Sequence, residues 1–267
     1  MKTAIVKGEN GLYGLQERNG KFYSSETLSS INEIFTGSIK FQEETNENFT
    51  KVKLEIPVKP SKIFCPALNF RSHSSETKQK NPEFPYFFLK FENAIIPWNE
   101  KIKCHSDIQK LDYEGEIAAI IGKKAYGVSK EEASEYIGGF AVVNDVSARD
   151  FQAQYAENLG KNWIMSKAAD TFLPISSSVF LGKYEKFNIR TEVNGQVRQN
   201  SDTDDMIFSF PDMVSYLSQH ITLLPGDMIL SGTPEGVAAS GKYPFLKHND
   251  SVKISSDKIG LIDNVID

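Results

Sequence analysis

The stretch LDYEGEIAAII, residues 111–121, decides how the rest of the chain is interpreted. A strand signal covers Leu111–Ile121 and ends at Gly122, and the apolar run in its second half predicts that this strand is buried. Side chains two positions apart on a strand point to the same face, so Glu114 and Glu116 are predicted to project together. Two neighbouring carboxylates in an apolar setting repel each other and lose hydration, so a proton, a base or a metal ion must compensate them. The alternative is a solvent-facing strand edge that carries ordinary charges.

A third acid follows the next apolar run. Asp145 comes after Phe140–Val143, which predicts a second buried strand that ends just before this carboxylate. Three carboxylates without a nearby histidine or cysteine suit oxygen-preferring cations such as Mg²⁺, Mn²⁺ or Ca²⁺ rather than zinc. Spacing along the chain does not show that Asp145 meets Glu114 and Glu116, so the cation site is a hypothesis at this point.

Composition indicates a globular protein. The chain has 267 residues, of which 40% are hydrophobic and 24% charged, so it can bury a core as one large domain or as a large and a small one. The net charge of −5 and the absence of a long basic run argue against nucleic-acid binding. No stretch approaches the roughly 20 apolar residues of a membrane helix. The first residues lack the apolar core of a signal peptide, so we expect a cytoplasmic protein.

The first sixty residues are predicted to form a small, separate unit. Alternation over Thr3–Lys7 and Lys51–Val58 predicts short strands, and the polar segment Glu43–Asn48 between them predicts a loop. Two prolines then mark a boundary near residue 59. We therefore expect a small β-rich N-terminal domain over residues 1–58 and a catalytic domain over residues 59–267.

Beyond this boundary, short apolar runs alternate with a few helix signals. Lys130–Tyr136 is rich in helix-forming residues and follows Ser129, a good N-cap, and Phe210–Gln219 predicts a second helix. The dipeptide Asn194-Gly195 predicts a tight hairpin turn. The remaining signals are short strands, so the predicted fold class is a mixed, β-rich α+β fold and not a doubly wound parallel sheet.

Several motifs occur in an order and spacing typical of one known family. They are Ala67–His73 (ALNFRSH), Phe88–Lys90 (FLK), Asp112–Glu116 (DYEGE), Gly138–Gln152 (GGFAVVNDVSARDFQ), Lys167–Phe172 (KAADTF), Leu224–Asp227 (LPGD) and Ser231–Val237 (SGTPEGV). Over most of residues 62–267 the chain resembles the fumarylacetoacetate hydrolase family. The resemblance implies a fold of rolled, stacked β-sheets with few helices, and a homodimer.

The resemblance also implies a chemistry. It makes Glu114, Glu116 and Asp145 the ligands of a divalent metal ion, Mg²⁺ or alternatively Mn²⁺ or Ca²⁺, and makes the substrate a small anionic keto acid. The expected function is hydrolysis of a C–C bond in an acylpyruvate or related diketo acid, through an enolate that the metal ion stabilises. The alternatives are isomerisation or decarboxylation of 2-hydroxy-2,4-dienedioates or oxaloacetate, and a non-catalytic metal-binding scaffold.

A histidine and a glutamate lie three residues apart in a polar segment. If Ser72–Thr77 forms a helical turn, His73 and Glu76 share a face, and the carboxylate can orient the imidazole for general-base catalysis. Their spacing alone favours a solvated pair on a polar loop. The resemblance favours the catalytic interpretation, with Arg71–Phe84 as a lid that orders over the substrate.

Lys167 is an ordinary surface lysine by its local pattern, and only the resemblance places it in the metal site, with a catalytic role. Three carboxylates, one dication and Lys167 would then sum to a neutral site, which accepts an anionic substrate with little repulsion.

Four further residues are candidates for substrate binding. Arg149 and Gln152 lie three apart in the helix-compatible segment Ala148–Asn158, so they can face one pocket, and arginine can hold a carboxylate with two hydrogen bonds. A solvated helix face is the alternative. Thr233 begins a turn whose hydroxyl and backbone N–H groups can bind an oxygen, although a plain turn explains it equally well. The resemblance adds Asn69.

Overall fold

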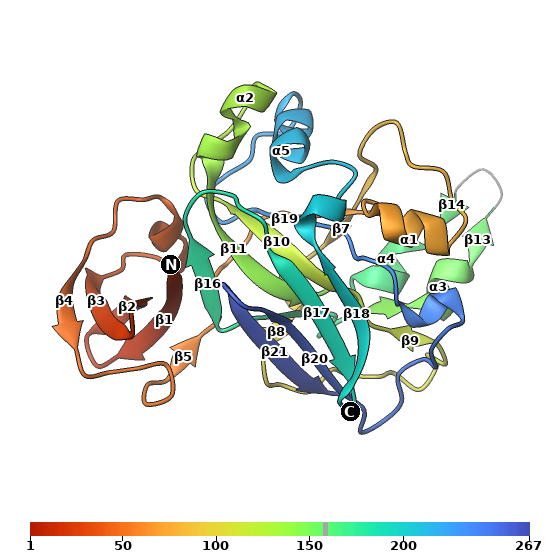
Figure 1. The fold of residues 1–267 in the computed structure, drawn as a ribbon, viewed down its shortest axis with the longest axis horizontal. Coiled ribbons are helices and arrows are strands. Elements are labelled where there is room, and N and C mark those ends of the chain that lie inside the picture. Colours follow the sequence, from red (N-terminus) through yellow and green to blue (C-terminus); the bar gives the residue numbers. More distant parts are fainter. Residues whose placement is uncertain (157–159) are drawn as a thin grey trace.

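A large β-sheet forms the centre of the computed structural model, which describes residues 1–156 and 160–267 (Figure 1). Its main path runs β4-β3-β2-β1-β16-β11-β10-β19-β6-β7, with β5, β8 and β15 paired at its sides. The strands are β1 (Lys2–Gly8), β2 (Gly11–Arg18), β3 (Lys21–Thr27), β4 (Phe41–Thr45), β5 (Leu54–Glu55), β6 (Ile63–Pro66), β7 (Phe87–Lys90), β8 (Ile95–Pro97), β10 (Gly115–Ile121), β11 (Ile137–Asn144), β15 (Leu173–Ile175), β16 (Ser178–Leu181) and β19 (Met228–Leu230).

A second, four-stranded sheet packs against the middle of the first (Figure 1). It has the order β18-β17-β20-β21 and contacts β10 and β11 through β17, β20 and β21. Its strands are β17 (Asn188–Val193), β18 (Gln196–Asp202), β20 (Ser251–Ser256) and β21 (Gly260–Val265). Two short pairs complete the described strands: β9 (Leu111–Asp112) with β12 (Ser147–Ala148), and β13 (Tyr155–Ala156) with β14 (Gly160–Lys161).

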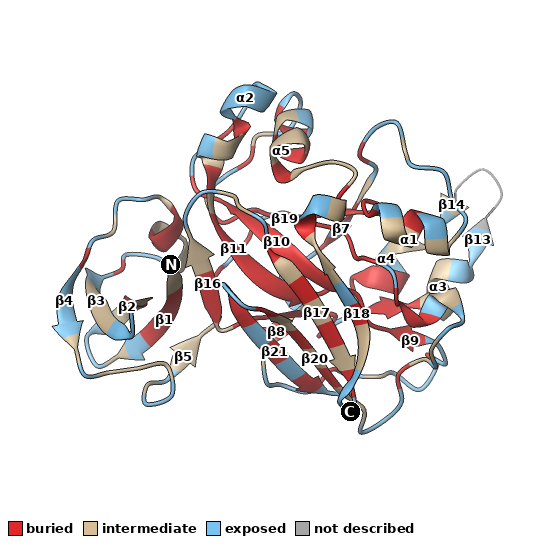
Figure 2. Ribbon diagram, in the orientation of Figure 1, coloured by how far each residue is buried: buried red, intermediate tan, exposed pale blue. Residues whose placement is uncertain are grey.

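Strand β10 is buried on both faces, which explains its unbroken apolar sequence (Figure 2). Ile117, Ala119 and Ile121 belong to the core between the two sheets, whereas Ala118 and Ile120 face a second core on the opposite side. The strand was predicted as one run over Leu111–Ile121. It is instead split into β9 and β10, which pair with different partners.

The N-terminal strands β1–β4 form the lobe at the left of Figure 1, and β1 joins them to the rest of the large sheet by pairing antiparallel with β16. The strand predicted at Thr3–Lys7 is confirmed as part of β1. The loop predicted at Glu43–Asn48 is wrong in its first half, because β4 continues to Thr45 by pairing with β3. The strand predicted over Lys51–Val58 is only the two residues of β5. The domain boundary near residue 59 stays a prediction.

The helices are few and short, as predicted. The helix at Lys130–Tyr136 is confirmed, with Ser129 as its N-cap, and the hairpin at Asn194-Gly195 joins β17 to β18. The end of the segment Ala148–Asn158 lies outside the described residues. In the described part of the chain, no helix is both long and apolar enough for a membrane span. The elements are α1 (Arg71–Glu76), α2 (Lys130–Ala133), α3 (Arg149–Ala153), α4 (Trp163–Lys167), α5 (Phe210–Ser218) and the 3₁₀ turns η1 (Ile31–Phe35), η2 (Glu92–Ala94), η3 (Ser134–Tyr136), η4 (Thr203–Asp205) and η5 (Ala238–Ser240).

Helix α5 begins with a capping box that gives a first testable prediction. The Ser209 hydroxyl accepts a hydrogen bond from the backbone N–H of Asp212, and the Asp212 carboxylate accepts one from the N–H of Ser209. Ser209→Ala should lower the free energy of unfolding by about 1 kcal/mol in a urea titration, because the backbone N–H of Asp212 loses its acceptor. Ser209→Asn should recover most of this loss. Equal urea midpoints for wild type and Ser209→Ala would show that the cap adds nothing.

Candidate metal centre and cavity

Three carboxylates converge at one end of the central strands. Gly115 of β10 pairs with Asn144 of β11, so Glu114, Glu116 and Asp145 lie at the same end of the sheet. One carboxylate oxygen from each lies within 4.8 Å of the others, and all three residues are buried. The backbone N–H of Asp145 also donates to the carbonyl of Glu114 at 2.9 Å. Asp145 therefore meets the glutamate pair, which spacing along the chain could not show.

Two buried lysines compensate part of this charge. The Lys167 ammonium donates to Glu114 Oε2 at 2.5 Å and to Asp145 Oδ2 at 2.9 Å. The Lys90 ammonium lies 2.8 Å from Asp145 Oδ1 as a close ion pair and donates to two backbone carbonyls. Lys167 therefore lies in the carboxylate cluster and not on the surface.

Lys90 was not predicted as a site residue, although the sequence carries a signal for it. Lys90 stands two positions after Phe88 on the short apolar strand β7, so both side chains point to the same, buried face. A lysine at an inward position of an apolar strand is almost never buried without a partner. This pattern could have indicated an acidic partner inside the protein.

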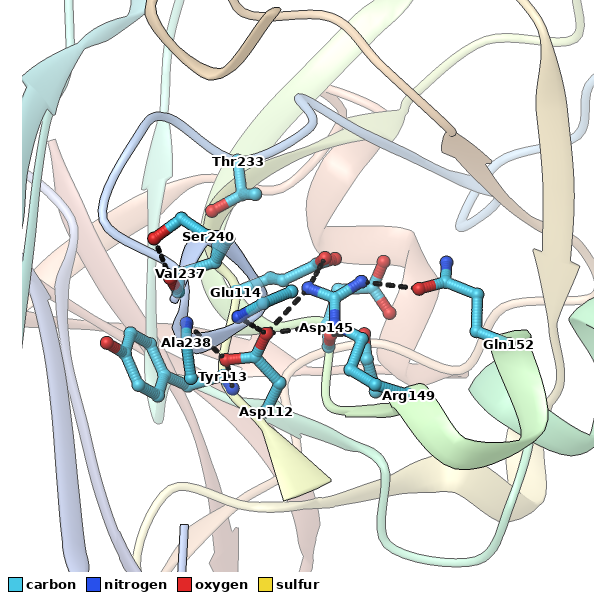
Figure 3. Close-up of polar contacts among 12 residues, drawn as sticks. Asp112, Tyr113, Glu114, Asp145, Arg149, Gln152, Thr233, Val237, Ala238 and Ser240 are labelled. Atoms are coloured by element: carbon cyan, nitrogen blue, oxygen red, sulfur yellow. Dashed lines mark hydrogen bonds and ion pairs between the residues drawn. The ribbon is translucent and has the colours of Figure 1, made fainter. Parts of the chain in front are cut away.

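Arg149 joins the cluster from helix α3 (Figure 3). Its Nη2 lies 2.6 Å from Glu114 Oε1 and 2.8 Å from Asp112 Oδ2, and its Nε donates to the same Asp112 oxygen at 2.9 Å. Its Nη1 donates to Gln152 Oε1 at 2.8 Å. Arg149 and Gln152 thus lie together, as their spacing predicted, but the guanidinium faces protein carboxylates. Its role in substrate binding stays a prediction.

The protein compensates the carboxylates unequally. Burial raises the pKa of Glu116 well above its ordinary value, and the charges of Asp145 and Glu114 raise it further. Burial would also raise the pKa of Glu114, but the cationic groups of Lys167 and Arg149 bring it down to about 2. Glu116 accepts a hydrogen bond from the backbone N–H of Gly232 at 2.9 Å, and in the described part of the chain it forms no ion pair.

This uncompensated carboxylate makes the donor set fit a hard divalent cation, which takes oxygen ligands. Charge counting supports the fit but corrects the neutral balance predicted from the sequence, because three more charged groups belong to the cluster than were counted. With the acids ionised, four carboxylates and three cations leave one negative charge, and a dication would change it to one positive charge, which attracts an anionic substrate. The groups are Asp112, Glu114, Glu116 and Asp145, and Lys90, Arg149 and Lys167.

Helix α1 places the histidine and glutamate beside this cluster. His73 Nδ1 lies 3.6 Å from Glu76 Oε2, and each side chain is 13% exposed, so the two are not a solvated pair. The Glu76 carboxylate accepts the backbone N–H of Gly236 at 3.1 Å, and the N–H and hydroxyl of Ser72 donate to Asp205. Burial lowers the pKa of His73 below its ordinary value of 6.5, despite the neighbouring carboxylates. The imidazole is therefore predominantly neutral at pH 7.

A polar cavity of about 310 Å³ opens between helix α1 and the carboxylate cluster. A cavity of about 370 Å³ lies elsewhere, between η1 and β11, but we place the site in the smaller one because the predicted residues line it. Asp145 and Glu76 do not line this cavity but contact residues that do, Lys167 and His73 respectively. The predicted residues that line it are Asn69, His73, Glu114, Glu116, Arg149, Gln152, Lys167 and Thr233.

Two of these lining residues mainly shape the wall. The Asn69 amide donates to the carbonyls of Phe208 and Ser231 at 3.0 and 2.7 Å and accepts from the N–H of Phe208 at 2.8 Å. The Thr233 hydroxyl accepts from Gln199 at 2.7 Å and donates to a backbone carbonyl. Their polar atoms are engaged with the protein, so their contact with substrate stays a prediction.

Fold and site together define a β-rich protein with a buried cluster of three carboxylates at the end of two central strands. The sequence model described as fumarylacetoacetate (FAA) hydrolase C-terminal matches residues 62–267. The chain belongs to the fumarylacetoacetate hydrolase family, as the sequence motifs indicated, and its homologues in that family are enzymes.

The relatives carry the names of several reactions. Oxaloacetate tautomerase YisK of Bacillus subtilis is 36% identical, over 100% of this chain and 96% of its own length. The structure of 5-carboxymethyl-2-hydroxymuconate delta-isomerase from Mycobacterium smegmatis matches with a TM-score of 0.81 and 31% identity, over 100% of this chain and 99% of its own. That of fumarylpyruvate hydrolase from Pseudomonas aeruginosa, in complex with Mn²⁺ and pyruvate, has a TM-score of 0.70 and 29% identity, over 78% and 90% of the two chains.

Proposed function

We propose that this protein catalyses the dication-dependent interconversion of the keto and enol forms of a 2-oxo dicarboxylic acid such as oxaloacetate. The observation that carries the proposal is the buried three-carboxylate cluster, which shares one cavity with His73. A relative matched over the whole chain is named an oxaloacetate tautomerase, and a matched structure of similar extent is named an isomerase. Both names describe rearrangement without hydrolysis.

Glu114, Glu116 and Asp145 would hold the cation, for which Mg²⁺, Mn²⁺ and Ca²⁺ are candidates because all three take oxygen ligands. The bound dication would act as a Lewis acid that favours negative charge on the substrate oxygen. The Mn²⁺ in the fumarylpyruvate hydrolase complex supports an ion of this kind. Lys167 and Arg149 keep Glu114 ionised, since they hold its pKa at about 2.

His73 supplies the base in this proposal. Its neutral imidazole takes a proton from carbon 3 of the keto form, and the electrons of that C–H bond form the new C2–C3 double bond. The electrons of the carbonyl bond move to oxygen 2, which takes up a proton from water to complete the enol, and the His73 imidazolium returns its proton to water. Glu76 keeps the ring oriented, and the N–H of Gly236 keeps Glu76 in place. The same steps in reverse give the keto form.

Hydrolysis of a C–C bond in an acylpyruvate or related diketo acid, predicted from the sequence, is the second candidate. The His73–Glu76 pair favours it, because an oriented imidazole can equally deprotonate a water molecule. The fumarylpyruvate hydrolase among the matched structures also supports it. Decarboxylation would pass through the same enolate. A non-catalytic scaffold is the least favoured alternative, because the homologues are enzymes.

Ultraviolet absorbance of enol-oxaloacetate tests the proposal. The metal-free protein with added Mn²⁺ or Mg²⁺ should accelerate the decay of the enol above the rate of metal alone, EDTA should abolish the gain, and fresh metal should restore it. Cleavage of an acylpyruvate without any effect on enol decay would establish the hydrolase instead. Inactivity toward both, with Mn²⁺ bound, would support the scaffold.

We also expect the protein to be a cytoplasmic homodimer that binds neither nucleic acid nor membranes. The dimer and the cytoplasmic location rest on the family resemblance and on the sequence, respectively. Sedimentation of the purified protein gives its mass in solution, for which we expect twice 29.9 kDa.

A further inference from the structure

Asp112 is a fully buried carboxylate with an unusually large set of donors (Figure 3). Its Oδ1 accepts the backbone N–H groups of Tyr113 and Ala238, both at 2.9 Å. Its Oδ2 accepts the N–H of Ala239 at 3.0 Å and Nε of Arg149 at 2.9 Å, and also forms the ion pair with Arg149 Nη2. Both oxygens are therefore engaged by the protein, and this carboxylate has no free position for a cation.

Arg149 divides its charge between two carboxylates. Its Nη2 lies 2.8 Å from Asp112 and 2.6 Å from Glu114. The buried Asp112 and the cavity-lining Glu114 therefore share one guanidinium. If Asp112 lost its charge, Glu114 alone would balance the guanidinium and would offer less negative charge to a dication. The two contacts to Asp112 also fix where the guanidinium lies.

Tyr113 makes a separate connection to helix α1. Its buried hydroxyl donates to the carbonyl of Gly236 at 2.8 Å, and the N–H of the same Gly236 donates to the Glu76 carboxylate. Gly236 has φ +103°, and a Cβ there would lie 2.1 Å from the carbonyl of Arg198, so this backbone requires glycine. Tyr113 and Asp112 thus bind successive parts of one loop.

We propose that Asp112 and Tyr113 are positioning residues with separate tasks. Asp112 sets the charge and place of Arg149 and thereby the affinity of Glu114 for the dication. Tyr113 holds Gly236 in the position from which its backbone N–H donates to the Glu76 carboxylate. Tyr113 thereby orients His73 through Glu76. This inference rests on the proposed function, since it assigns how that site is held in its active geometry.

Calorimetric Mn²⁺ titration of the metal-free protein, together with enol turnover, separates the two tasks. Asp112→Asn should weaken Mn²⁺ binding by about 10–100-fold, a typical effect for a residue that supports a metal ligand. Tyr113→Phe should leave Mn²⁺ affinity within twofold of wild type but lower kcat by roughly tenfold, as expected when one hydrogen bond that orients the base is lost.

Asp227→Asn is the matched control. Asp227 is also fully buried, accepts backbone N–H groups of Lys62 and Leu224, and forms a 2.6 Å ion pair with the Lys62 ammonium, but it lies at the other end of β19. It should lower the melting temperature while Mn²⁺ affinity stays at the wild-type value. A loss of affinity in Asp112→Asn therefore cannot come from reduced stability alone.

A double variant extends the test to the charge itself. Asp112→Asn combined with Arg149→Gln removes both the carboxylate and the guanidinium of this ion pair. Glu114 is then no longer bound by the guanidinium, so Mn²⁺ affinity should return to within tenfold of wild type. If Asp112→Asn does not fold, this neutral pair is compared directly with wild type, and a larger loss overturns the role of Asp112.

Wild-type Mn²⁺ affinity in Asp112→Asn, or wild-type kcat in Tyr113→Phe, would overturn the corresponding assignment. Either result leaves wild-type turnover intact and so leaves the proposed function standing. Failure of the proposed function would instead appear in the wild-type protein, as no Mn²⁺ binding or no effect on enol decay.

Discussion

Glu116→Gln should abolish dication binding and lower turnover by roughly 10³-fold, yet raise the melting temperature of the metal-free protein. The losses of binding and turnover follow from the removal of one of three carboxylate ligands. The rise in melting temperature follows because Glu116 is buried beside Asp145 and Glu114 and forms no ion pair in the described part of the chain, so its charge destabilises the protein. Glutamine keeps an oxygen that can accept the N–H of Gly232.

Glu114→Gln is the matched variant, because it removes the same charge from a compensated position. Lys167 and Arg149 lower the pKa of Glu114 to about 2, so its ionised form stabilises the folded protein above the ordinary pKa of 4.5, and this contribution is lost only as pH falls toward 2. The raised pKa of Glu116 has the opposite effect, because the unfolded chain ionises this group above pH 4.5 while burial opposes its ionisation in the folded protein, so stability is lost as pH rises from 4.5 toward the raised pKa. At pH 7, without metal, Glu114→Gln should melt below wild type and Glu116→Gln above it.

Scanning fluorimetry with and without Mn²⁺ measures both variants. Wild type should be stabilised by Mn²⁺ and neither variant should respond. A metal-free Glu116→Gln protein that melts below wild type would contradict the account of an uncompensated carboxylate.

His73→Ala should lower the rate of enol–keto conversion by roughly 10²–10⁴-fold while Mn²⁺ affinity stays close to wild type. The imidazole lines the cavity and pairs with Glu76. It does not belong to the candidate metal-ligand set, which consists of three carboxylates. His220→Ala, at an exposed position after α5, should leave both quantities unchanged. Retention of wild-type turnover by His73→Ala would remove His73 as the base, for tautomerisation and for hydrolysis alike.

The pH dependence gives an independent check on the same residue. Burial lowers the pKa of His73 below 6.5, so the neutral base is available at pH 7 and is lost as pH falls through that lowered pKa. In wild type, kcat/KM should therefore decline only below about pH 6.5, and this decline should be absent from the residual activity of His73→Ala. A decline that begins well above pH 7 would contradict the neutral, buried imidazole.

The sequence predicts the fold class because its strongest patterns are local. The apolar run 115–121, the cap at Ser129 and the turn at Asn194-Gly195 each specify a strand, a helix start or a hairpin from neighbouring residues alone. The split of 111–121 into two strands escapes prediction because it depends on which partners each half finds across the sheets. The β4 strand escapes for the same reason, since pairing with β3 overrides its polar composition.

The site shows the same division between local and non-local information. Glu114 and Glu116 could be predicted to lie together from their spacing, whereas the approach of Asp145 depends on the register of β10 with β11. Asp112 is missed because a single acid next to a strand looks like a solvated charge, and apart from the adjacent Tyr113 its donors come from residues 37 to 127 positions away. The family resemblance supplied the long-range contacts that spacing could not.

An anomalous-scattering map from crystals grown with Mn²⁺ and a non-reactive 2-oxo acid analogue such as oxalate tests the proposed metal centre directly. We expect a single strong peak among the carboxylates of Glu114, Glu116 and Asp145, with oxalate in the cavity beside His73. A well-ordered map without a peak there, or with Mn²⁺ bound only elsewhere, would contradict the proposed metal centre.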